Sequence, residues 1–322
     1  MVIKSVLTSP EHLCVYDDQH RSRTLEFCQR IDVALLKEDK RVLIDLRYVE
    51  SATAAASLIL FAIVNRAQLL KGSSDYATFR LPHRERNPDG YRWIVKTGLA
   101  RALKSGSRQK LEELSKDQNF FQSSDQPSEH VFKTIAMLQS KAQFNTPQLR
   151  LLAGGITEAA LNVSHHAYDD PAYQDQLEIM GKRWWQCAWF DPESDTVFFI
   201  IFDLGIGVFN SLRSGTSAAS LPSSIQEEVS VLNDSFKLGV SRYKDKPERG
   251  RGSEDIKSPI HQNCSQMEKL LVYTGRASYV YSKYGESVGG AAGHLVQYMP
   301  GTLVQWQLSP NRRGGNDSDK HS

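Results

Sequence analysis

The first hundred residues alternate between short apolar runs and amphipathic stretches. Apolar positions recur at helical spacing over residues 20–37, and the compact apolar run at 41–46 is typical of a buried strand. The longer apolar run at 54–70 predicts a helix. Three further elements are predicted by the same patterns: a strand at 2–7, a strand at 76–81 and a helix at 90–103. This order predicts a small α/β domain over residues 1–104.

The remainder of the chain has a different pattern. Residues 105–130 are rich in Ser, Gln, Lys, Asp and Glu, which predicts a linker with one short helix. Residues 131–309 are helical by pattern up to about 164, and strands are predicted after that, at 197–202, 270–281 and 303–308. Helices followed by strands predict an α/β sandwich. The polar residues 310–322 predict a disordered tail.

Composition narrows the class of protein. A chain of 322 residues with 40% hydrophobic and 24% charged residues is typical of a folded protein of about two domains. Its 39 Lys and Arg against 37 Asp and Glu give a net charge of +2, which does not favour nucleic acid as a partner. The four cysteines are far apart, and the longest apolar stretch is too short to span a bilayer, so we expect a cytoplasmic protein without membrane spans.

Glu158 and Asn162 lie four residues apart in a stretch with a helical pattern. This spacing puts both side chains on one face of a helix, so a carboxylate and an amide oxygen converge on one point. A carboxylate can accept a proton from an attacking water, and an amide oxygen is a neutral ligand for Mg²⁺. Taken alone, the pair is more typical of an amphipathic helix with two exposed polar residues.

An apolar strand pattern ends in Asp203, and two glycines, Gly205 and Gly207, follow. An acid at the mouth of a pocket could accept a hydrogen bond from an exocyclic amine such as that of adenine. The two glycines would let the backbone approach a flat ring closely. Without other features, the same pattern indicates only a strand that ends in a glycine turn.

Two further features involve glycine. Residues 237–251 contain six basic residues against two acidic ones, and Gly250, Arg251 and Gly252 lie at the C-terminal end of this basic stretch. Glycine amides beside cations can close over a polyphosphate, and the lack of recurring aromatic residues favours a nucleotide over a nucleic-acid backbone. Thr302 follows a glycine at the start of the last predicted strand, where its hydroxyl could reach the acid or the base through water.

Taken in order, these features resemble the ATP-binding domain shared by gyrase, histidine kinases, the ninety-kilodalton heat-shock chaperones and MutL, the GHKL superfamily. The resemblance covers about residues 148–308 and implies a GHKL-type α/β sandwich, the Bergerat ATP-binding fold. It implies that Glu158 is the general base, Asn162 the Mg²⁺ ligand and Asp203 the residue that binds adenine. It also implies further nucleotide contacts: Gly205 and Gly207 beneath the ring, Gly250, Arg251 and Gly252 at the hinge of an ATP lid, and Thr302 in the last motif.

Within the first block, residues 43–54 resemble the strand and loop of the STAS domain of anti-sigma-factor antagonists. In that family the loop carries a phosphorylatable serine at a helix N-terminus, and Ser51 takes this place here. We interpret Ser51 as an N-cap of the following helix and not as a phosphate acceptor. The resemblance predicts a STAS-like α/β domain in front of the GHKL-type domain.

The combined prediction is an Mg²⁺- and ATP-binding regulatory protein that hydrolyses ATP or phosphorylates a serine of a partner protein. The alternative is a nucleotide-gated interaction module without useful turnover, because Ser253, Glu254 and Asp255 stand where the family has apolar residues. Either function implies a protein partner. Many GHKL proteins dimerise, so the resemblance also allows a homodimer.

Overall fold

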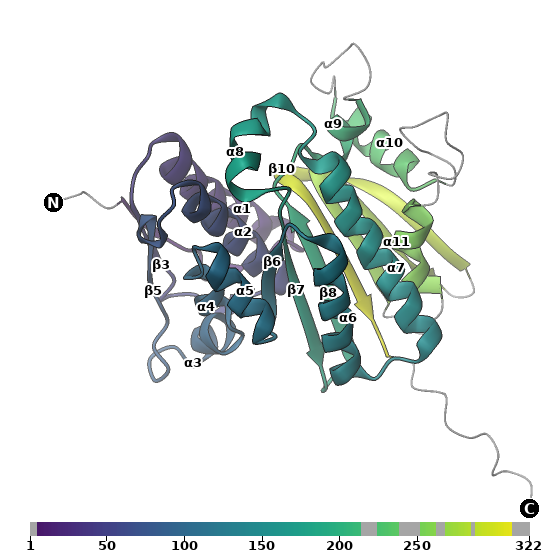
Figure 1. Cartoon of the computed structure of the whole chain (residues 1–322), viewed down its shortest axis with the longest axis horizontal. Helices are drawn as coiled ribbons and strands as arrows, with labels where there is room; N and C mark the ends of the chain where they lie inside the picture. Colours follow the sequence, from purple (N-terminus) through teal and green to yellow (C-terminus); the bar gives the residue numbers. More distant parts are fainter. Residues whose placement is uncertain (1–4, 214–223, 238–251, 262–267, 285–286, 311–322) are drawn as a thin grey trace, which may run out of the picture.

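The computed structural model describes residues 5–213, 224–237, 252–261, 268–284 and 287–310. It is a mixed α/β structure with a parallel sheet in its N-terminal part and a five-stranded antiparallel sheet in its C-terminal part (Figure 1). Helices pack against both sheets. Among the described residues, none of the helices combines the length and the apolar character that crossing a bilayer requires.

The N-terminal sheet has three parallel strands in the order β1-β3-β5, and a short parallel pair, β2 and β4, lies in a sheet of its own. The strands are β1 (Ser5–Thr8), β2 (His12–Leu13), β3 (Val42–Asp45), β4 (Ser51–Ala52) and β5 (Ala77–Arg80). The helices of this part are α1 (Asp18–Asp32), η1 (Val33–Lys37), α2 (Ala54–Leu70), η2 (Ser74–Tyr76), α3 (Pro88–Tyr91), η3 (Arg92–Lys96) and α4 (Leu99–Leu103). The apolar runs therefore form strands and helices close to the predicted ranges.

The prediction that Ser51 caps α2 is wrong. The N-cap is Thr53, whose Oγ1 accepts a hydrogen bond from the backbone N–H of Ala56. Ser51 belongs to β4, where extended backbone holds its hydroxyl 3.0 Å from Nδ1 of His12. Two residues separate Ser51 from the helix, which puts its hydroxyl out of reach of the free amides of the first turn.

The C-terminal sheet has the strand order β6-β7-β8-β10-β9, and every neighbouring pair is antiparallel. Its strands are β6 (Phe121–Ser124), β7 (Trp184–Asp191), β8 (Thr196–Asp203), β9 (Lys269–Tyr284) and β10 (Ser287–Leu308). The helices of this part are α5 (Arg108–Lys116), α6 (Pro127–Ala142), α7 (Thr146–Asn162), η4 (Val163–Ala167), η5 (Pro171–Tyr173), α8 (Gln174–Met180), α9 (Gly207–Arg213), α10 (Ile225–Ser235) and α11 (Gly252–His261).

The segment 105–130, for which a linker is predicted, contains helix α5 and strand β6. Strand β6 pairs with β7, and its polar residues Gln122 and Ser123 are buried. Hydrogen bonds compensate for the loss of water around these side chains. The Ser123 hydroxyl donates to the backbone carbonyl of Trp184 at 2.7 Å, and the Gln122 amide donates to that of Asn119 at 2.7 Å. Composition alone predicts a linker here because it does not reveal such partners. Pro310 is buried, and the rest of the predicted tail lies outside the described residues.

Helix α2 is buried along nearly its whole length because it packs between the C-terminal sheet and the helices α1, α4 and α8. It contacts β7 and β8 on the face of the C-terminal sheet that is opposite to α6 and α7 (Figure 1). Successive side chains of β7 point to opposite faces of the sheet. Gln186 donates to Thr134 of α6 on one face, and the Trp185 indole donates to the buried Asn65 of α2 on the other at 2.9 Å. The sheet is therefore covered on both sides.

Candidate functional site

Helix α7 presents the predicted pair Glu158 and Asn162 on the face of the C-terminal sheet that also carries α6. Asn145 caps the helix, since its side chain accepts the backbone N–H of Gln148 at 2.8 Å. Gly155 allows α11 to pack closely, because a Cβ there would lie only 3.1 Å from the Asp255 carbonyl oxygen. The two helices together form one wall of a cavity.

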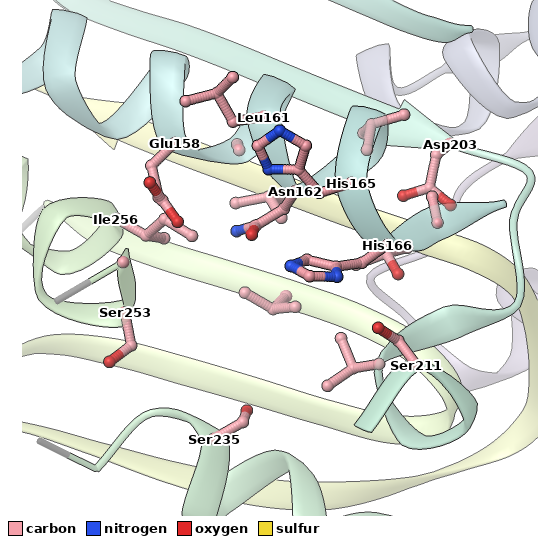
Figure 2. A pocket seen from close by; sticks show the side chains of 18 of the residues that line it. Glu158, Leu161, Asn162, His165, His166, Asp203, Ser211, Ser235, Ser253 and Ile256 are labelled. Carbon is pink, nitrogen blue, oxygen red and sulfur yellow. The ribbon is translucent and has the colours of Figure 1, made fainter. Parts of the chain in front are cut away.

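The Glu158 carboxylate is half-buried and has polar neighbours on both helices. Burial raises its pKa, and the nearby carboxylate of Asp255 raises it further. A hydrogen bond from the Asn162 side chain opposes this rise in pKa. In Figure 2 the Glu158 and Asn162 side chains project into the same space. A side chain at Gly252 would meet the Glu158 carboxylate, so a larger residue at this position would displace that flexible side chain.

Asp203 ends strand β8 and is only 5% exposed. Its partners in the sheet are Trp184 of β7 and Thr302 of β10. Directly paired residues project from the same face of a sheet, so all three side chains share the face of α6 and α7. The backbone pairing thereby directs Asp203 toward the cavity.

Burial raises the pKa of Asp203 to about 7. Backbone N–H groups of Gly205 and Thr302 donate to its carboxylate and oppose this rise in pKa, and the Gly205 bond is 2.8 Å long. A carboxyl group with a pKa near neutrality changes its charge under physiological conditions. Asp203 is thus a fixed, buried hydrogen-bonding group that loses its proton near pH 7.

The turn after Asp203 depends on close backbone contacts. A Cβ at Gly205 would clash with the backbone carbonyl of Ala167 in η4, and the next amide, of Ile206, donates to that carbonyl at 2.7 Å. Gly207 begins α9 with a φ of +79°, a conformation that favours glycine. The predicted glycines are therefore required by the turn that joins β8 to α9.

One cavity of about 640 Å³ lies between α7, η4, α11 and the ends of β8 and β10 (Figure 2). Its lining includes six of the predicted site residues: Glu158, Asn162, Asp203, Gly207, Gly252 and Thr302. Gly205 lies in the adjoining turn, and Gly250 and Arg251 lie outside the described residues. Positions that are 144 residues apart in the sequence, from Glu158 to Thr302, thus meet at one site.

Four ionisable side chains of the lining are not among the predicted site residues: His165, His166, Lys182 and Asp255. The two histidines follow Asn162 in η4, a π-helical turn, and Figure 2 shows His166 between Asn162 and Asp203. Their place directly after the Glu–Asn pair is the signal that could have identified them. Lys182 has no such signal. It lies two residues before β7, and the pairing of Trp184 with Asp203 brings the start of this strand beside the cavity.

No protein-family model matches the chain, and no curated protein matches it. The functional argument therefore depends on the geometry of the cavity and on the chemistry of its residues.

Proposed function

We propose that this chain is a regulatory Mg²⁺- and ATP-binding protein of the GHKL type, which hydrolyses ATP or phosphorylates a serine of a partner protein. In this proposal residues 131–309 have the Bergerat fold, and the N-terminal part is STAS-like. The mixed α/β architecture supports it, since the cavity lies on the face of the antiparallel sheet that α6 and α7 cover.

One observation carries the proposal: residues chosen from four separate sequence features line the same cavity. Glu158 and Asn162 come from α7, Asp203 from β8, Gly252 from α11 and Thr302 from β10. Chance matches to short motifs would have no reason to meet at one site. The volume of about 640 Å³ also lies in the usual range for small-molecule sites.

The residues at the strand ends fit the base of ATP. Asp203 is buried, held by two backbone donors and exposed to the cavity. Its ionised carboxylate can accept a hydrogen bond from the exocyclic amine of adenine. Thr302 lies opposite Asp203 in the sheet and brings a hydroxyl to the same place. This end of the cavity would bind and orient the nucleotide.

The residues on α7 fit Mg²⁺ and the phosphates. The Asn162 amide donates to Glu158, which leaves its side-chain oxygen as a hard, neutral ligand of the kind that Mg²⁺ takes beside waters and phosphate oxygens. When bound, Mg²⁺ neutralises negative charge on the phosphates. Lys182 and the two histidines add polar or cationic groups to the lining.

Glu158 fits the role of general base. Its carboxylate would accept a proton from the attacking water or from the serine hydroxyl of a partner, and its raised pKa makes it a stronger base for that transfer. Hydrolysis and phosphorylation require the same residue, and the nucleophile that reaches the cavity would decide between the two reactions.

A second candidate function is a nucleotide-gated interaction module without useful turnover. The first turn of α11 carries Glu254 and Asp255, and Asp255 lines the cavity beside Glu158. Two carboxylates at a helix N-terminus repel phosphate where the helix dipole would otherwise attract it. Under this alternative, nucleotide occupancy changes which surface binds a partner, and chemistry plays no part.

The test is calorimetric titration of the full chain with a non-hydrolysable ATP analogue and Mg²⁺. We expect saturable binding that Asp203→Asn weakens by at least roughly a hundredfold, since the amide would turn a donor toward the adenine amine. Asn162→Ala should weaken binding only when Mg²⁺ is present. Asp191→Asn is the matched control, because Asp191 ends β7 and lies outside the lining of the cavity.

Absence of saturable binding by the wild-type chain would contradict both candidate functions. Equal losses in Asp203→Asn and Asp191→Asn would indicate a general effect of removing a carboxylate and would contradict the assignment of the base site. Turnover that disappears in Glu158→Ala would favour the enzyme over the interaction module.

A further inference from the structure

Three potential metal ligands gather on the N-terminal part of the chain, at residues that play no part in the nucleotide cavity. The ligand atoms of Glu11, His12 and Glu50 all lie within 4.8 Å of one another. Glu11 and Glu50 are exposed, and His12 is partly exposed. The cluster is therefore open to ions from solvent.

The backbone holds this cluster together. Strands β2 and β4 pair in parallel with His12 opposite Ser51. The Glu11 carbonyl accepts the backbone N–H of Glu50 at 2.7 Å and that of Ser51 at 3.2 Å. Residues 11–12 and 50–51 are thus fixed side by side although about forty positions separate them in the sequence. The ladder places both carboxylates beside the imidazole in the folded chain.

Both ring nitrogens of His12 have a polar neighbour. Its Nδ1 lies 3.0 Å from the Ser51 hydroxyl, and its Nε2 lies 3.9 Å from Oε2 of Glu50. When Nδ1 carries the proton and donates it to Ser51, Nε2 directs its lone pair toward the carboxylate. A histidine that ligates a metal commonly donates its other ring N–H to a neighbouring group in this manner.

The cluster contains two carboxylates, whose negative charges a bound cation would offset. Within the described parts of the chain, neither Glu11 nor Glu50 forms an ion pair with a lysine or arginine. His12 offsets a carboxylate charge only when its imidazole is protonated, and with a neutral imidazole the two carboxylates repel each other. A divalent ion between them would remove this repulsion, and the imidazole nitrogen would favour Zn²⁺ over Mg²⁺, which prefers oxygen ligands.

We propose that Glu11, His12 and Glu50 form a binding site for a divalent transition-metal ion of the Zn²⁺ type. Ligand atoms on one zinc ion are about 3.4 Å apart, by bond lengths of about 2.0–2.2 Å and tetrahedral geometry. The ligand atoms lie within 4.8 Å of one another, so metal binding would require these side chains to move closer together. Three protein ligands leave the fourth position to water or to a further ligand.

The site would tie the segment before α1 to the segment before α2. Tyr16 and Arg21, which follow β2 closely, contact Gln305 and Tyr273 of the C-terminal sheet. A bound ion would therefore stabilise the part of the chain through which the two sheets meet. The proposal is independent of the nucleotide site, and its test does not depend on ATP binding.

The test is a competition titration of Zn²⁺ between the full, metal-free chain and a chromophoric chelator, with excess Mg²⁺ to occupy oxygen sites. We expect saturable binding of one equivalent with a dissociation constant in the micromolar range. His12→Gln and Glu50→Gln should each weaken it by at least about tenfold, and Ser51→Ala by about tenfold through loss of the hydrogen bond to His12. His83→Gln is the matched control, since His83 is an exposed histidine of the same part of the chain outside the cluster.

Cobalt(II) substitution gives a second readout, because its visible absorption reports ligand type and geometry. We expect that absorption to change in His12→Gln and to persist in His83→Gln. Circular dichroism of the metal-free variants should match that of the wild type, as the side chains are exposed. Zinc binding of equal strength in His12→Gln, Glu50→Gln and wild type would overturn the proposal, and so would the absence of saturable binding.

Discussion

The two ends of the cavity are built in different ways. Asp203 sits at the end of a central strand, is almost fully buried and accepts two backbone hydrogen bonds. Glu158 projects from a helix and is half-buried. Its neighbours are the Asn162 side chain and a second carboxylate, Asp255. Backbone pairing fixes the first group, and side-chain packing between two helices fixes the second. Under the proposed function, the strand end would bind the rigid adenine ring, and the helix end would carry out the phosphoryl chemistry.

The largest effect is expected at the helix end. Glu158→Gln keeps the size of the side chain and removes the base, so turnover should fall roughly 100- to 10,000-fold. Nucleotide affinity should stay nearly unchanged, because Asp203 is untouched. Steady-state phosphate release and calorimetry check the two quantities. Glu112→Gln, at an exposed position of α5, is the control, and a variant of Glu158 with full turnover would contradict the division of roles.

At the strand end, Asp203→Asn should stabilise the free protein at alkaline pH. The pKa of Asp203 is raised to about 7, whereas an unfolded aspartate titrates near pH 4. Between these values the folded chain holds a proton that the unfolded chain releases, so the free energy of unfolding falls as pH rises through this window. The variant lacks this loss and should gain about 1–4 kcal/mol at pH 8 and less at pH 5.

Urea unfolding of wild type and Asp203→Asn at both pH values measures this difference. Asp191→Asn should show no comparable gain, since its carboxylate accepts hydrogen bonds at the surface and its pKa is lowered. An Asp203→Asn variant that is less stable than wild type at the higher pH would show that the carboxylate is a structural group and not a strained binding group.

Adenosine affinity should increase with pH through the same group. With a pKa of about 7, Asp203 is ionised in about one tenth of molecules at pH 6 and about nine tenths at pH 8. The ionised form carries a full negative charge and is the stronger acceptor for the adenine amine, so affinity should rise by up to about tenfold. Displacement of a fluorescent nucleotide by adenosine, which lacks titrating phosphates, measures it. A flat profile would contradict the role of Asp203 ionisation.

The smallest effect is expected from Asp255→Asn. Removing this carboxylate lowers the pKa of Glu158, because burial alone then raises it. The acidic limb of the pH–turnover profile should therefore move to lower pH. Glu254→Gln removes a carboxylate from the same helical turn and should leave the limb in place. Equal shifts in both variants would indicate a general charge effect of α11.

The sequence predicts those parts of the site whose signal is local. The apolar run that ends in Asp203 forms β8, and the four-residue spacing of Glu158 and Asn162 is realised on α7. The coarse mixed α/β class is confirmed, whereas the predicted linker over 105–130 and the predicted cap at Ser51 are wrong. The assignments to the GHKL and STAS families, and the roles of the residues, stay predictions.

Features that depend on distant partners are not predictable in this way. Strand β10 begins at Ser287 and includes a run of Gly and Ala that has no strand pattern. This run is a strand because its backbone pairs with β9. Strand β6 is polar and is stabilised by its bonds to neighbouring segments. The group of Glu11, His12 and Glu50 likewise forms only because the β2–β4 pairing brings residues 11–12 beside residue 50.

The position of α2 has a consequence for how the chain can be cut. A fragment limited to residues 131–309 would lose β6 from the edge of its sheet and α2 from its back, which would leave the indole of Trp185 in water without Asn65. We expect such a fragment to aggregate and the intact chain to unfold in one cooperative step. The N-terminal part then serves as the hydrophobic backing of the sheet that carries the cavity, so a ligand bound on either side adds to the stability of both.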